Sequence, residues 1–394
     1  MDWSQKIPPE TTDRIIDHLH YDRPTLRHCA LVCHAWLPAS RFHLFYTVTV
    51  SGVRIFASEK LVESAPWVAY CVRDLKLTGT IIPQNKDPEA PLVPIVTKFT
   101  HLRSLHLYWT LQRFPSPSLL THLSSITELV FVNVRFVNNC ERLAKFIALF
   151  PYLQKLIIRT ISSELPPREQ MIGADELVAV LSRSSIRKLL VGGMHSTIAS
   201  ALCRASLPHL THFARIRVYS KAPAEHAMYV ALSPSLREVS LDVTGWTKPD
   251  IDDTDYMRLI EPCPTGLPTL RIIGLPSQLA VAARVFGDIV QPRFATTHLH
   301  LICPEAFSQS KDQIIQEIQD LANVLQADWT RTTRILVCFA GRIMDERQLG
   351  ARTEGIAKQI FADLLKRGTV QLQFVSDLME AIDRELVLEP NMPQ

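Results

Sequence analysis

Apolar residues near the start of the chain recur at the three- and four-residue spacing of amphipathic helices. A first stripe runs from Ile15 to Leu19, and Pro9 suits the first turn of that helix, where no intrahelical bond needs its missing N–H. A second stripe follows Asp22, whose side chain is of a type that caps helices, and continues to Trp36. Two short helices are therefore predicted at this end of the chain.

The pattern changes from helical to alternating soon afterwards. Pro38 is expected to stop the second helix, and a short third helix is predicted over residues 41–45. Residues 42–53 then alternate in the manner of a β-strand. We therefore predict a small helical domain over residues 1–50 and a second domain over residues 51–394.

One strand motif, Leu-x-x-Leu-x-Leu, keeps returning in the second domain. Its clearer copies begin at Val72, Leu102, Ile126, Leu153, Ile186, Leu236 and Leu270, and looser ones lie around Leu210–Val218, Leu299–Leu301, Ile335–Val337 and Leu372–Phe374. Helix-like apolar stretches separate the copies. This arrangement resembles the leucine-rich-repeat solenoid, with less regular spacing and without the Asn that usually follows the strand.

The predicted fold class is thus α/β, with an N-terminal helical part and an irregular leucine-rich-repeat-like solenoid built on a parallel sheet. An ordinary α/β domain with a flat parallel sheet stays open as the alternative, because alternating strands and helices do not specify curvature. The end of the chain is less repetitive. Amphipathic helices over 313–324 and 354–365 around a strand at 334–340 would suit a capping unit.

The N-terminal helices carry a more specific pattern, Ile7-Pro8-x-Glu10, a helix, and then Leu31-Val32-Cys33-x-x-Trp36. This pattern resembles the F-box, the adaptor-binding motif of cullin-type ubiquitin ligases. The resemblance implies packing against the C-terminal helices of a Skp-type adaptor. It gives contact or supporting roles to the following residues: Ile7, Pro8, Ile15, Leu26, Leu31, Val32, Cys33 and Trp36.

The match departs from the family at Thr11 and Thr12, where an aliphatic residue is usual, which leaves less apolar surface for an adaptor. Helices of this size do not form a stable domain alone and need a partner surface. The alternative to an adaptor is the rest of the chain, with the apolar stripe packed on the second domain.

Composition limits the function classes. The chain has 394 residues, of which 47% are hydrophobic and 21% charged, which is an ordinary globular profile. A net charge of +3 is too small to indicate nucleic-acid binding. We expect no signal peptide, no membrane span and reduced cysteines, and hence a cytoplasmic or nuclear location, or both.

Three apparent chemical motifs have simpler interpretations. Asp250, Asp252 and Glu261 have calcium-loop spacing, but Asp255 stands where that loop needs Gly. Four histidines, His18, His20, His28 and His34, lie near Cys29 and Cys33, without a Cys-x-x-Cys pair for zinc. The segment 192–196 lacks the partners of a phosphate loop or nucleophile elbow. We therefore predict no metal, no cofactor and no catalytic residue.

Side chains that alternate with the buried leucines should point away from the helices. Basic and tyrosine residues at such positions are candidates for binding an acidic or phosphorylated peptide: Lys155, Arg159, Lys188, Arg215, Arg217 and Tyr219. The alternative is a merely solvated face, since Glu128, Glu238 and Asp242 are expected on the same side.

Together these observations predict a substrate receptor of a Skp–cullin–F-box ubiquitin ligase, with an unknown protein substrate and neither nucleic acid nor membrane as a partner. A non-degradative F-box protein with a structural role is the first alternative. An α/β enzyme with an unrecognised site is the second.

Overall fold

A computed structural model describes residues 8–20, 22–51, 55–78, 93–108, 123–132, 134, 140–159, 173–192, 198, 201–202, 204–216, 235–243, 267–287, 298–304, 311–326, 334–340, 355–368 and 370–375. The chain divides into two compact units, residues 1–186 and 187–394. The division does not coincide with the predicted domain boundary after residue 50, which stays a prediction.

The first unit begins with three helices of similar length, α1 (Pro9–His18), α2 (Arg23–Val32) and α3 (Leu37–Tyr46). The prediction that Pro38 ends the second helix is wrong. The second helix already ends at Val32, and Pro38 lies in the first turn of α3, where proline costs no hydrogen bond. The third helix is longer than predicted and leads directly into the first strand.

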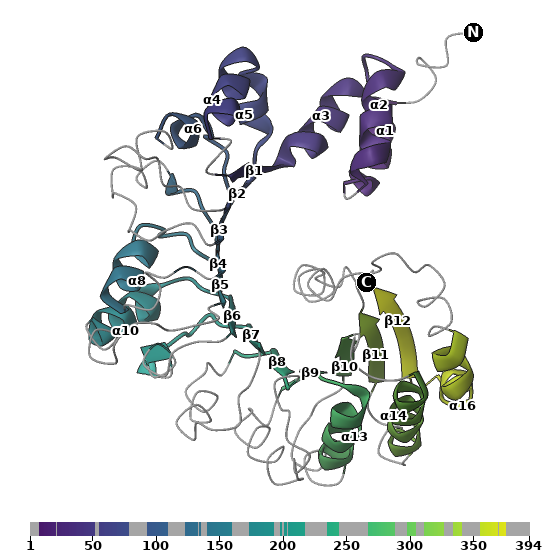
Figure 1. The fold of residues 1–394 in the computed structure, drawn as a ribbon. Coiled ribbons are helices and arrows are strands. Elements are labelled where there is room, and N and C mark those ends of the chain that lie inside the picture. The colour runs from purple at the N-terminus through teal and green to yellow at the C-terminus, as the bar shows by residue number, and fades with distance from the viewer. Residues whose placement is uncertain are drawn as a thin grey trace. The chain divides into compact units, whose positions relative to one another are not determined.

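The rest of the first unit repeats strands and helices. Its strands are β1 (Thr47–Ser51), β2 (Asp74–Thr78), β3 (Ser104–Tyr108), β4 (Glu128–Val132) and β5 (Lys155–Arg159). Its further helices are α4 (Ile55–Ser64), α5 (Trp67–Cys71), α6 (Val93–Lys98), α8 (Cys140–Ile147) and α10 (Ala174–Arg183). The strands pair in parallel and in sequence order, and the helices lie on one side of this sheet (Figure 1).

The second unit continues the same plan. Its strands are β6 (Lys188–Gly192), β7 (His212–Ile216), β8 (Glu238–Asp242), β9 (Thr269–Ile273), β10 (His298–Pro304), β11 (Arg334–Ala340) and β12 (Val370–Val375). Helices α13 (Pro276–Val285), α14 (Lys311–Val324) and α16 (Ala362–Lys366) again lie on one side (Figure 1). All neighbouring strands of this unit pair in parallel and in sequence order.

The repeated leucines form the core between sheet and helices. Leu75, Leu105, Leu129 and Leu156 occupy one register row and are buried. Burying a side chain of this size stabilises the fold by about 1.5–3 kcal/mol. Each repeat therefore depends on its neighbour for a large part of its stability, as in a solenoid.

Backbone hydrogen bonds join successive repeats just before each strand. The carbonyl of Arg73 accepts from the amides of Arg103 and Ser104, at 2.8 and 2.9 Å. The carbonyl of Arg103 does the same for the next repeat, and those of Thr127, Arg187 and Thr211 continue the pattern. The recurrence of one bonding pattern confirms the predicted leucine-rich-repeat-like α/β fold with a parallel sheet.

One predicted register is wrong. The motif assigned to Leu270, Ile273 and Leu275 begins three residues earlier, because Leu270 pairs with Leu299 and Ile272 with Leu301. Ile273 falls in the other row, beside Ile302. Several adjacent apolar residues made both registers plausible, and only the pairing of neighbouring strands decides between them. In the terminal segment, the predicted helix over 313–324 and the predicted strand over 334–340 are confirmed. The single helix predicted over 354–365 is instead interrupted by a turn at Phe361, with helical residues 355–360 before it and α16 after it.

Candidate interaction surfaces

The three N-terminal helices form a small core of their own. Ile16 and Leu26 are fully buried, and Cys29 is nearly so. The carboxylate of Asp22 caps α2 by accepting bonds from the Thr25 amide at 3.1 Å and the Thr25 hydroxyl at 2.6 Å. These bonds lower the pKa of Asp22. Leu26, predicted for adaptor binding, thus lies in the interior of the helices as a supporting residue.

Other apolar side chains of these helices face solvent. Leu31 is 84% exposed, the adjacent Val32 60%, and Ile15 47%. Large apolar side chains that neighbour one another at the surface are typical of interaction sites. Leu31 and Val32 are adjacent at the end of α2, and we call these two residues together with Ile15 of α1 the apolar surface. Among the described residues of the motif, these three and Pro8 are the exposed apolar residues.

The remaining motif residues differ in exposure, and one lies outside the described residues. Pro8 precedes α1 and is exposed, whereas Cys33 and Trp36 are half-buried. Thr12, which departs from the family pattern, is buried and so removes little from the surface. Ile7 lies outside the described residues.

Arginine and aromatic side chains connect α3 to the first repeat. The Arg41 guanidinium lies 4.6 Å from the centre of the Trp67 ring, and Phe45 meets the same ring edge to face at 5.2 Å. The guanidinium of Arg73 lies 5.4 Å from the ring centre of Phe42. Sequence analysis missed these contacts, because the partners are far apart along the chain.

Hydrogen bonds strengthen the same junction. Arg23 donates to the carbonyls of Leu44 and Thr47, at 3.1 and 3.0 Å, where α3 passes into β1. The Arg73 amide donates to the Tyr46 carbonyl at 2.9 Å. The carbonyls at a helix C-terminus have no intrahelical partner, so these donors stabilise the end of α3 and attach it to the sheet.

Two histidines tie α1 to α3. The Nδ1 atoms of His20 and His43 lie 2.9 Å apart, and His43 Nε2 lies 2.7 Å from Asp17 Oδ1. Burial, followed by the charge of His43, lowers the pKa of His20. One proton suffices for the bond between the rings, so the pair holds the two helices together most firmly when at least one ring is neutral.

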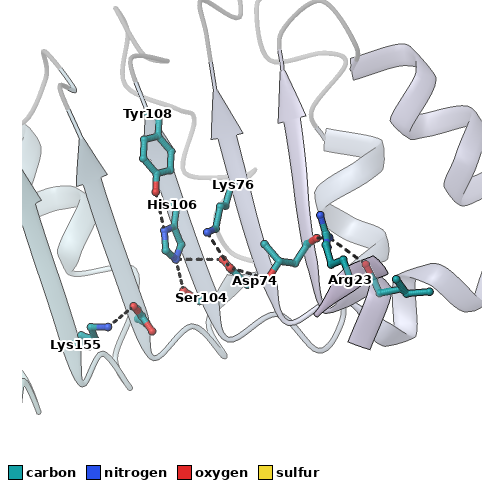
Figure 2. A network of polar contacts seen from close by, with 10 residues as sticks. Arg23, Asp74, Lys76, Ser104, His106, Tyr108 and Lys155 are labelled. Atoms are coloured by element: carbon teal, nitrogen blue, oxygen red, sulfur yellow. Dashed lines mark hydrogen bonds and ion pairs between the residues drawn. The ribbon is translucent and has the colours of Figure 1, made fainter. Parts of the chain in front are cut away.

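We call the side of each sheet opposite the helices the open face. In the first unit, Asp74 lies at the centre of a polar network on this face (Figure 2). Asp74 accepts a bond from the Thr47 hydroxyl at 3.1 Å, and Lys76 Nζ lies 3.7 Å from the carboxylate. Burial raises the pKa of Asp74 to about 6, against the opposing effect of Lys76.

His106 adjoins Asp74 in the same network. Its Nε2 lies 3.2 Å from Asp74 Oδ1 and 2.9 Å from Ser104 Oγ, and its ring stacks near Tyr108 (Figure 2). Burial lowers the pKa of His106 to about 3, with further contributions from the positive charges of Lys76, Lys155 and Arg159. At neutral pH the contact with Asp74 therefore involves an uncharged imidazole and is no ion pair.

The open face of the second unit has a comparable cluster. Arg271, which is buried, lies 3.2 Å from Glu238 and donates to His300 Nδ1 at 3.0 Å. His212 lies 3.8 Å from Glu238. Burial lowers the pKa of His300 to about 3 and that of His212 to about 4, with nearby cations contributing to both shifts. Sequence analysis missed Arg271 because the register of β9 was misassigned.

The predicted substrate-binding residues do not form one row. Lys155 begins β5 and pairs with Glu128 at 2.8 Å, and Arg159 ends the same strand. Lys188 pairs in register with His212, in the row that begins the strands. Arg215 instead pairs in register with Val191 and Leu241, in the row of the core leucines. The predicted alternation is therefore wrong at Arg215. Arg217 and Tyr219 lie outside the described residues.

The structure bears in part on the metal-site, loop and membrane-span motifs considered in the sequence. In the part of the chain that the structure describes, no three His, Cys, Asp or Glu side chains are placed to hold a metal ion. The segment 250–261, considered as a calcium loop, lies outside the described residues. Of the segment 192–196, considered as a phosphate loop or nucleophile elbow, the structure describes Gly192, which ends β6. No described helix combines the length and apolar character needed to cross a membrane.

Comparisons with known proteins give structural neighbours only. No protein-family model matches the chain, and no curated protein matches its sequence. The leucine-rich-repeat-containing protein LegL7 from Legionella pneumophila aligns over 71% of this chain and 85% of its own, with 15% identity and a TM-score of 0.46. A protein from Bacteroides fragilis aligns over 74% of this chain and 72% of its own, with 12% identity and a TM-score of 0.40.

A third neighbour comes from the structure of the Rad7 and Elc1 complex in yeast. It covers 87% of this chain and 92% of its own, with 12% identity and a TM-score of 0.34. At these values the resemblances carry no functional argument. The repeat fold rests on the strand order and register described above.

Proposed function

We propose that this chain is the substrate receptor of a Skp–cullin–F-box ubiquitin ligase, with the N-terminal helices binding a Skp-type adaptor and the repeats binding a protein substrate. The observation that carries the proposal is the exposure of Leu31 and Val32 within the motif Leu31-Val32-Cys33-x-x-Trp36. The buried Leu26 suits a supporting role, and the exposed Leu31 and Val32 suit contact roles.

The proposed mechanism is proximity. A receptor holds its substrate beside a ubiquitin-charged enzyme that the cullin scaffold recruits, which raises the effective concentration of the reacting groups. The receptor itself supplies no bond-making residue. Contacts of Arg23, Arg41 and Arg73 around α3 suit this role, because they attach the adaptor-binding helices to the first strands of the repeat region.

The substrate is proposed to bind the open faces, with Lys155 and Arg159 as candidates on the first unit and Lys188 as a candidate on the second, as expected from their strand positions. Arg217 and Tyr219, which lie outside the described residues, stay in this proposal. Arg215 is left out of it, because its register places it in the row of the core leucines. Because exposed ion pairs are individually worth about 0–1 kcal/mol, recognition would need several of them and would weaken with salt.

Affinity purification of the tagged chain from cells, followed by mass spectrometry, tests the proposal. Recovery of both a Skp-type adaptor and a cullin is the expected result. Adaptor without cullin would favour the non-degradative structural role, and recovery of neither would contradict the proposal.

A further inference from the structure

Charged side chains on the open face of the first unit are segregated along the strands. The first positions of β2, β3, β4 and β5 are Asp74, Ser104, Glu128 and Lys155, which lie in one register row. Both acidic residues of these strands' open face belong to this row. The potential on the open face is therefore least positive near the beginning of the strands.

The third and fifth positions of the same strands have the opposite character. They are Lys76, His106, Val130 and Ile157 in one row, and Thr78, Tyr108, Val132 and Arg159 in the next. No acidic residue occurs among these strand positions, whereas two cations do. Figure 2 shows Lys76, His106 and Tyr108 nearer the strand arrowheads than Asp74 and Lys155. The carboxyl-end half of this face is thus a surface complementary to anions.

The surroundings of His106 agree with this distribution. Beyond the effect of burial, the three charges that lower its pKa are all positive: Lys76, Lys155 and Arg159. An anion that approaches the ring from solvent enters the same positive field. The neutral His106 and the Tyr108 hydroxyl add hydrogen-bonding groups without adding charge.

We propose that this surface binds an extended acidic segment of a protein partner, with two carboxylate side chains about four residues apart on either side of an apolar one. The inference rests on the proposed function and specifies the substrate class of the open face. The binding surface consists of Lys76 and Arg159 at its two ends and the half-buried Tyr108 and Val132 between them.

The spacing follows from the sheet. Lys76 and Arg159 stand on strands that are three pairings apart, and parallel strands lie about 4.8 Å apart, which gives about 14 Å across the strands. Arg159 also lies two residues further along its strand, about 7 Å, so the two backbone positions are about 16 Å apart. The long Lys and Arg side chains can shorten this distance by leaning toward a segment bound between them. Four residues of extended chain span about 13–14 Å. Carboxylates suit these sites better than phosphate, because phosphate recognition relies on several cations that converge on one group.

Fluorescence anisotropy with the full chain tests the inference. The probe is a labelled peptide with the central sequence Glu-Thr-Leu-Thr-Glu. Three control peptides are compared with it: one with Gln in place of both Glu, one with the two Glu separated by a single Ser, and one with phosphoserine in place of both Glu. We expect the first peptide to bind best, and its affinity to fall between 50 and 500 mM salt.

Charge reversal identifies the site. Lys76→Glu and Arg159→Glu should each weaken binding by about three- to tenfold, and together by more. Arg183→Glu, on the exposed side of α10, is the matched control and should leave binding unchanged. Lys76→Gln with Arg159→Gln replaces the double reversal if that variant fails to fold, and should also weaken binding.

Equal binding of the Glu and Gln peptides, full binding by the double variant, or binding of the phosphoserine peptide alone would each overturn the inference. Adaptor binding, measured on the same preparations, separates this result from the proposed function. Retained adaptor binding without peptide selectivity contradicts the acidic-segment site alone. Peptide selectivity without adaptor binding contradicts the ligase role alone.

Discussion

The Arg41 guanidinium stacks on the indole of Trp67, with 4.6 Å between the guanidinium carbon and the ring centre. Arg41 belongs to α3 and Trp67 begins α5, so one contact joins the N-terminal helices to the first repeat. A cation over an indole is attracted to the negative face of the ring. The position of the proposed adaptor-binding helices is therefore fixed partly by this pair.

Replacing Arg41 with Gln should lower the free energy of unfolding by about 0.5–1 kcal/mol, the usual value of an exposed cation–π contact. Chemical denaturation of the whole chain measures this change. Arg27→Gln is the matched control, because Arg27 is exposed on α2 and should change stability little. Equal losses of stability in the two variants would show that the contact between Arg41 and Trp67 does not stabilise the junction.

Gly173 should tolerate alanine poorly. Its φ of +81° lies in the left-handed region, and an added Cβ would collide with the backbone and Cβ of Glu141 at the start of α8. Gly368 has a φ of +69° and open space around it. Thermal denaturation should show a loss of about 1 kcal/mol for Gly368→Ala, from backbone strain alone, and a clearly larger loss for Gly173→Ala. Similar losses would mean that α8 and α10 adjust freely.

Acidification should destabilise the chain through His106 and His300. Burial holds both pKa values at about 3, below the ordinary histidine value of 6.5, so the folded state binds fewer protons than the unfolded state between these two pH values. Their stabilising contribution is complete above about pH 6.5 and is lost as the pH falls towards 3. Within that range, each histidine should lower the free energy of unfolding by roughly 1 kcal/mol for each pH unit of acidification.

Asp74 acts in the opposite direction, because burial raises its pKa to about 6. The unfavourable effect of ionising it is complete above about pH 6 and disappears as the pH falls towards 4. Urea denaturation at pH 7 and pH 5 should show a smaller acid loss for His300→Asn and a larger one for Asp74→Asn. The reverse order would contradict the assigned environments.

Much of the fold could be predicted from sequence because its core positions are unambiguous. Leu75 and Leu77, for example, are flanked by polar residues, so only one register buries both. The register failed at β9, where Ile272 and Ile273 are adjacent and equally apolar. It failed again at Arg215, where a charged residue occupies a row that is otherwise apolar.

The candidate sites were less predictable, for a physical reason. A helical stripe identifies apolar residues without showing which of them become buried, so Leu26 and Leu31 look alike in sequence although one is internal and the other exposed. Contacts such as Arg41 with Trp67 depend on how α3 meets the repeats. The segregation of charge on the open face needs the register of neighbouring strands.

Binding of a purified Skp-type adaptor, measured by isothermal titration calorimetry, shows whether Leu31 and Val32 form an adaptor-binding surface. Leu31→Ala combined with Val32→Ala should leave thermal stability nearly unchanged, because both side chains are exposed, while adaptor affinity falls by a hundredfold or more. This loss corresponds to about 1.5–3 kcal/mol for each buried interface side chain.

Leu61→Ala, which truncates a 42% exposed leucine on α4, is the matched control and should bind the adaptor like the unaltered chain. Trp36→Ala with Leu31→Ala should also abolish binding, although the half-buried Trp36 adds an effect on stability. The account predicts tight binding by the unaltered chain and loss only in the variants of the apolar surface. Absence of binding by the unaltered chain, or undiminished affinity in the Leu31 and Val32 double variant, would contradict it.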